Sequence, residues 1–111
     1  MNLNEYFGKG LNYADYLTKI EQQFHQLENG EDPEGFADYF SINLKRIERL
    51  NKSIKLSDEQ QNKLKSIEPD FRILTISEGW CGDASQIVPV VEKIANGLNI
   101  EHHIVFRDEN P

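Results

Sequence analysis

The single cysteine of the chain, Cys81, lies in the segment Trp80-Cys81-Gly82-Asp83-Ala84. The residues before this segment are apolar and β-branched, and apolar residues after it recur at helical spacing, so we expect a strand–loop–helix junction. The start of a helix presents backbone N–H groups and the positive end of the helix dipole, which stabilise a thiolate relative to a thiol. Because the thiolate is the nucleophile, the position predicts thiol chemistry at Cys81.

The same segment limits that chemistry. Ala84 stands three residues after Cys81, where the second sulfur of a dithiol enzyme would lie. We therefore expect no dithiol–disulfide turnover by the chain alone, and an external thiol would have to resolve any mixed disulfide. The carboxylate of Asp83 opposes thiolate formation, and we expect this residue to cap the following helix. The simplest alternative for Cys81 is a small buried apolar residue.

Composition and charge disfavour several classes of function. A chain of 111 residues is long enough for one domain with a usable core. A net charge of −7 disfavours binding to nucleic acid or to an anionic membrane surface. No apolar run approaches the ~20 residues of a membrane span, and the first ten residues do not read as a secretory signal. A lone cysteine without an export signal favours a reducing cytoplasm.

The first part of the chain is predicted to be helical. Asn29-Gly30 should end one helix, and Asp32-Pro33 should begin the next as an N-cap followed by proline in the first turn. Leu64 and Ile67 are expected to point inward from a short third helix. The aromatic residues of these helices should pack together rather than form an exposed patch. Apolar residues at three- and four-residue steps place the helices at residues 13–28, 34–51 and 58–67.

The last part of the chain switches to strand, helix and strand. Residues 71–77 are apolar and β-branched, as in a buried parallel strand, and residues 100–107 alternate with period two. Between them, a helical pattern runs from the cysteine segment to about Asn96-Gly97. The fold class is therefore α/β, with a helical N-terminal part followed by one βαβ unit whose strands are parallel.

The cysteine motif resembles that of the thioredoxin superfamily. Trp80-Cys81-Gly82 follows a strand, and Pro89 lies eight residues after the cysteine inside the next helix. The longer segment from Glu78 to Ala84 is similar to bacterial thioredoxin-like proteins with a Trp-Cys-Gly-Asp-Ala motif and a helical N-terminal extension. The resemblance implies that Cys81 is the attacking cysteine and that Trp80 shields it. Gly82, Asp83 and Pro89 would support the loop and the helix.

The resemblance covers about half of a thioredoxin fold, residues 71–107. We therefore expect residues 1–69 to be a helical N-terminal extension, and residues 70–111 to be the N-terminal βαβ half of a thioredoxin-like domain, that is, a truncated thioredoxin fold. A two-stranded parallel sheet has exposed edges and little stability of its own. Either the chain continues beyond Pro111, or a second copy or a partner chain completes the sheet.

Two histidines and a group of basic residues are weaker candidates for a functional site. His102 and His103 point to opposite faces of a strand and cannot bind one ion together, so we expect neither a zinc site nor another cofactor. A basic cluster near the end of the second helix is the usual solvated helix end. Its functional alternative is a site for a small acidic or glutathione-like ligand. This cluster consists of Lys45, Arg46, Arg49 and Lys52.

Two hypotheses for function follow, and they leave open whether the protein is an enzyme. In the first, the protein is a monothiol redox protein or redox sensor: Cys81 reacts with protein thiols or disulfides, and glutathione or another low-molecular-weight thiol resolves the product. In the second, it is a non-catalytic interaction module that docks through Trp80. An iron–sulfur carrier is disfavoured, because monothiol glutaredoxins of that kind use Cys-Gly-Phe-Ser. The pH dependence of thiol alkylation separates the first two.

Overall fold

Two parallel strands and the helix that connects them form the centre of the molecule. The computed structural model describes residues 2–109. In chain order its elements are α1 (Leu3–Lys9), α2 (Tyr13–Asn29), α3 (Phe36–Ser53), α4 (Asp58–Lys65), β1 (Ile73–Ser77), α5 (Gly82–Leu98), β2 (His102–Phe106) and the 3-10 helix η1 (Arg107–Glu109).

The βαβ prediction is confirmed. Strands β1 and β2 pair in parallel, with a register that runs from Ile73 opposite His102 to Ser77 opposite Phe106. Each strand is shorter than its predicted range, because residues 71–72, 100–101 and 107 lie outside the ladder. In the described residues, β1 has no strand on its other side, so one edge of the sheet is unpaired.

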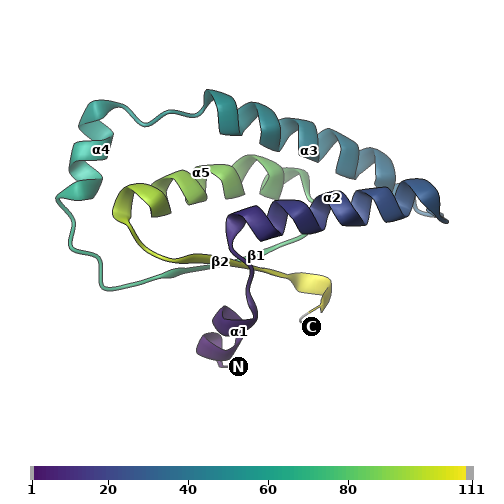
Figure 1. Cartoon of the computed structure of the whole chain (residues 1–111), viewed down its shortest axis with the longest axis horizontal. Helices are drawn as coiled ribbons and strands as arrows, with labels where there is room; N and C mark the ends of the chain where they lie inside the picture. The colour runs from purple at the N-terminus through teal and green to yellow at the C-terminus, as the bar shows by residue number, and fades with distance from the viewer. Residues whose placement is uncertain (1, 110–111) are drawn as a thin grey trace.

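The helices form layers on both sides of this sheet. Figure 1 shows α2, α3 and α5 on one side and α1 on the other, with α4 at the far end of the molecule. The aromatic residues pack as predicted: Phe40 is buried in the core, and Phe24 and Phe36 pack against it. The core draws on elements from both halves of the chain. Its buried members are Tyr16, Ile20, Phe40, Ile47, Ala84, Val88, Ile104 and Phe106.

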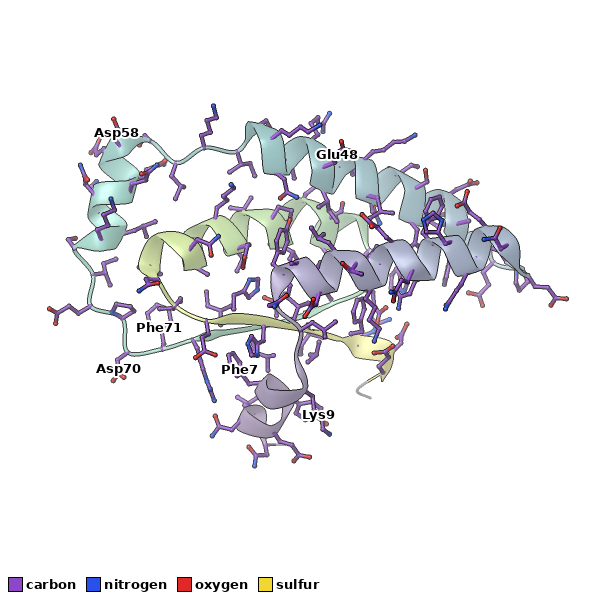
Figure 2. All side chains as sticks on the ribbon, viewed as in Figure 1. Phe7, Lys9, Glu48, Asp58, Asp70 and Phe71 are labelled. Carbon is purple, nitrogen blue, oxygen red and sulfur yellow. The ribbon has the colours of Figure 1, made fainter. Side chains whose placement is uncertain are left out.

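Helix α1 has no counterpart in the sequence prediction. Its buried side chain is Phe7, whose ring stacks on the ring of His103 with centroids 4.0 Å apart. Figure 2 shows Phe7 between α1 and the sheet. Beyond α1, Leu11 exchanges two backbone hydrogen bonds of 2.8 Å with Ile104, which adds a short antiparallel bridge beside β2. Strand β2 is therefore covered on both faces. A seven-residue helix with one buried side chain is too short to show a periodic pattern.

The start of α3 differs from the prediction. The helix begins at Phe36 rather than at residue 34, and Gly35 precedes it with a left-handed φ of 74°. Asp32 nevertheless caps the helix, because its carboxylate accepts hydrogen bonds of 2.8 Å from the N–H groups of Phe36 and Ala37. The intervening residues form a turn closed by a hydrogen bond from the Gly35 N–H to the Asp32 carbonyl.

Two further boundaries are corrected at α4 and α5. Helix α4 ends at Lys65, and Ile67, predicted to point inward, is 48% exposed. Helix α5 continues past Gly97 to Leu98 and ends where Asn99 takes a left-handed φ of 57°. Gly97 lies inside the helix where Leu64 of α4 approaches closely: a Cβ at this position would lie 2.6 Å from Leu64 Cδ1.

Candidate functional site

Cys81 lies between β1 and α5 as predicted. It is the N-cap residue of α5, which begins at Gly82, and its side chain is partly exposed. Its backbone closes the loop, since the Cys81 N–H donates to the Glu78 carbonyl at 3.2 Å. The prediction that Asp83 caps the helix is wrong, because the helix starts before Asp83. That carboxylate instead lies exposed in the first helical turn, where the dipole favours a negative charge.

The Trp80 ring contacts side chains from α3 and from η1. The indole stacks on Phe36 of α3 with centroids 6.0 Å apart, and the Arg107 guanidinium lies 5.2 Å from the indole centroid. The indole N–H is 3.5 Å from a carboxylate oxygen of Asp108. These contacts leave Trp80 half-buried and fix it beside the cysteine.

A small cavity of about 110 Å³ opens beside Cys81. It lies between the end of β1, the cysteine loop and the start of α5. Ala84, at the position where a dithiol enzyme carries its second thiol, is buried and lines this cavity. Ile76, which lines it from β1, is 61% exposed. The thiol is therefore next to an open and mainly apolar recess that a reaction partner can enter.

Helix α3 holds the backbone of the cysteine loop. Asn43, which is 2% exposed, donates from Nδ2 to the Gly79 carbonyl at 3.0 Å. Phe40 lies directly against Gly79, so that a Cβ at residue 79 would be 2.3 Å from Phe40 Cε1. The sequence prediction missed this role. Asn43 is a polar residue on the apolar stripe that contains Phe36, Phe40 and Ile47, and this interruption could have marked it.

Glu78 is a buried carboxyl group at the end of β1 that the prediction also missed. It is 8% exposed, and its Oε1 accepts a hydrogen bond of 2.6 Å from the Asp108 N–H. Burial raises the pKa of Glu78 above its ordinary value, and the hydrogen bond from Asp108 offsets part of this effect. The carboxylate therefore links the segment after β2 to the cysteine loop.

Tyr16 of α2 lies beneath the same region. Its hydroxyl is 2.9 Å from the Ser77 hydroxyl, and the side chain is almost fully buried. Burial raises the pKa of Tyr16 to about 12, and the charges of Cys81 and Glu78 add to this rise. The tyrosine therefore stays a neutral hydroxyl group close to the thiol.

Two other predicted site residues belong to the framework of α5. Pro89 is fully buried within the helix. Gly82 faces the guanidinium of Arg46, because a Cβ on Gly82 would lie 3.0 Å from Arg46 Nη1. Both positions shape the helix that begins at the cysteine.

The adjacent histidines of β2 lie apart, as predicted. His102 is buried between Thr75 Oγ1, at 2.7 Å from Nε2, and Glu92 Oε1, at 3.1 Å from Nδ1. His103 lies on the other face, where its Nδ1 is 2.8 Å from the Phe7 carbonyl oxygen. Within residues 2–109, no three His, Cys, Asp or Glu side chains come together as metal ligands. No helix in this range is long and apolar enough to cross a membrane.

Comparison with known proteins gives one finding. A family model described as Thioredoxin matches residues 30–111, a range that contains α3 as well as the βαβ unit. No curated protein and no solved structure matches the chain.

Proposed function

The chain belongs to the thioredoxin family, and from this premise we propose that it is a monothiol redox protein that uses Cys81 for thiol–disulfide exchange. The observation that carries the proposal is the position of the thiol. Cys81 is partly exposed, directly precedes α5 and borders an open cavity, while the alanine at position 84 provides no second thiol. This site can start an exchange and cannot finish it internally.

The exchange has two balanced steps. In the first, the Cys81 thiolate attacks one sulfur of a disulfide, which forms a mixed disulfide on Cys81 and releases the other half as a thiolate. In the second, an external thiolate attacks the sulfur of the bound half, which restores the Cys81 thiolate and releases a new disulfide. Partners would be protein disulfides together with glutathione or another low-molecular-weight thiol. Such a cycle fits a reducing compartment such as the cytoplasm, where external thiols are abundant.

The same thiol would serve as a redox sensor. Hydrogen peroxide would oxidise the thiolate to a sulfenic acid and release hydroxide. An external thiol would then condense with the sulfenic acid, releasing water and giving the same mixed disulfide. In both routes Trp80 covers one side of the loop, and the open recess beside Ala84 admits the partner.

A second candidate function is a non-catalytic thioredoxin-like docking module. One observation favours it: Ile76 is 61% exposed next to Cys81, on the strand whose outer edge is unpaired in the described residues. Apolar side chains and free backbone groups at a sheet edge are suited to binding another chain.

Alkylation of the thiol tests the first candidate. Because the start of a helix favours a thiolate, we expect the native protein to react with iodoacetamide at pH 7 faster than the same protein unfolded in urea. Cys81→Ser should take up no label. Native protein mixed with excess disulfide should gain one adduct by mass spectrometry and lose it to an added thiol.

A contrary result has a clear meaning. A native rate at or below the unfolded rate, together with no mixed disulfide, would leave only the docking function. Insulin reduction at the rate of a dithiol enzyme would refute the monothiol mechanism.

A further inference from the structure

Of the four residues in the basic cluster of α3, one turns toward the cysteine loop. Lys45, Arg49 and Lys52 are exposed, whereas Arg46 is partly buried. The Arg46 guanidinium lies against Gly82, 3.0 Å from where a Cβ of that residue would be. Gly82 directly follows Cys81, so the Arg46 charge lies against the backbone next to the cysteine, while Arg107 lines the recess at the thiol itself.

Buried hydrogen bonds fix the position of this charge. Asn43 uses its amide N–H to bind the Gly79 carbonyl at 3.0 Å and its amide oxygen to accept from Arg46 Nη1 at 3.3 Å. Because the amide group is planar, the first bond sets the direction of the second. Asn43 is 2% exposed, so solvent does not compete for these atoms. Asn43 therefore fixes the Arg46 guanidinium relative to the backbone of the cysteine loop.

The acidic groups around the loop do not neutralise Arg46. Asp108 pairs with Arg107 at 3.4 Å, and Glu78 accepts its hydrogen bond from the Asp108 N–H. Asp83 is exposed in the first turn of α5. Within residues 2–109, no carboxylate lies within 4.0 Å of the Arg46 guanidinium as an ion pair.

We propose that Arg46 determines the specificity of the Cys81 site by favouring anionic partners. The low-molecular-weight disulfides and thiols that exchange at Cys81 are then those that carry carboxylates. The inference rests on the proposed function, because it concerns which partners the thiol reacts with. Asn43 is the positioning residue, and the exchange itself follows the two balanced steps given above.

Two alkylating reagents of similar size measure this charge preference. Iodoacetate is an anion and iodoacetamide is neutral, and both lose iodide when the same thiolate attacks them. The ratio of their rates is therefore independent of the thiolate fraction. Two unit charges about 6 Å apart in water change a rate about threefold, so Arg46→Gln should lower the iodoacetate-to-iodoacetamide ratio about threefold at low salt. Glutamine removes the charge and keeps a side-chain N–H donor.

Two variants serve as controls for this measurement. Arg46→Lys keeps the charge and should keep most of the ratio. Arg49→Gln removes the same net charge from an exposed position of the same helix and should leave the ratio unchanged. Equal effects of Arg46→Gln and Arg49→Gln would overturn the proposal, because net charge alone would then explain the preference.

Disulfides of different charge extend the test to the exchange reaction. Mixed disulfide formation should be fastest with anionic glutathione disulfide, slower with neutral hydroxyethyl disulfide and slowest with cationic cystamine, each relative to the same protein unfolded in urea. Arg46→Gln should flatten this order. If the reagent ratio responds to Arg46 while no disulfide reacts, the proposed function fails and the charge preference stands. If all three disulfides react with equal relative rates, the specificity fails and the redox function stands.

Folding of the variants is checked by far-UV circular dichroism. Should Arg46→Gln not fold, the wild type still tests whether a positive charge acts at the thiol. Screening at high salt should then lower its iodoacetate-to-iodoacetamide ratio toward that of the unfolded chain. A ratio that does not change with salt overturns the proposal.

Discussion

Gly79→Ala tests whether α3 and the cysteine loop fit together as closely as the structure shows. The added Cβ would lie 2.3 Å from Phe40 Cε1, 2.9 Å from Cζ and 3.0 Å from Cδ1. Carbon atoms in contact prefer a separation of about 3.5–4.0 Å, so the ring or the loop must move by about 1 Å. Phe40 is 5% exposed and belongs to the buried core, so a shift of its ring disturbs its neighbours.

The expected cost combines two effects. Overpacking a core typically costs about 1–3 kcal/mol. A displaced loop also weakens the hydrogen bond from Asn43 to the Gly79 carbonyl, which contributes about 0.5–1.5 kcal/mol. We expect a loss of about 2–3 kcal/mol in the free energy of unfolding, which corresponds to a fall in Tm of about 10 °C for a domain of this size.

Urea unfolding provides the assay, read as a lower midpoint with an unchanged m value. Gly8→Ala is the matched control, because a Cβ there meets nothing within 4 Å and should stabilise α1 by up to about 1 kcal/mol. Adding Phe40→Leu to Gly79→Ala should recover about 1 kcal/mol relative to the sum of the single changes. Gly79→Ala unfolding within about 0.5 kcal/mol of wild type would refute the close packing.

Three further changes test the surroundings of the site. The pKa of Glu78 is raised in the folded state, so its ionisation lowers the free energy of unfolding at pH values above its ordinary pKa of about 4.3. Glu78→Gln should therefore raise the urea midpoint at pH 7. This gain should disappear near pH 4. His102→Leu should cost about 1–3 kcal/mol in urea unfolding, since it leaves two partners of a buried imidazole unpaired, whereas His25→Leu at an exposed site should change little. Ala84→Cys should form an internal disulfide with Cys81 under mild oxidant and gain insulin-reducing activity. The second thiol would then attack the mixed disulfide within the same molecule, at an effective concentration on the order of mM. Two thiols that still alkylate independently would contradict this.

Local sequence patterns predicted most of the fold. The stripes of α2 and α3 and the change of period at residue 71 each arise within one segment, so spacing alone reveals them. The errors occur where local rules compete. Asp32 caps α3 from beyond a turn, and α5 begins at Gly82, so that Cys81 and not Asp83 takes the capping position. Helix boundaries of this kind depend on backbone conformation as well as on residue type.

The candidate site was predictable only in its central segment. The position of Cys81 before α5 followed from the change of period, because strand, loop and helix are consecutive in sequence. Asn43 and Gly79 are 36 residues apart, and Tyr16 and Ser77 are 61 residues apart. No spacing rule within one element connects such pairs. Their contacts arise only when the helices pack on the βαβ unit.

These distant contacts give the helical part of the chain a direct role at the thiol. Phe40 and Asn43 set the path of the backbone before Cys81, and Tyr16 closes the space beneath it. A thiol reacts according to the charges and the backbone geometry around it, and here α3 supplies part of that geometry. The chemistry at Cys81 is therefore a property of the packed helices and the βαβ unit together, and changes in α3 should alter it without touching the cysteine motif.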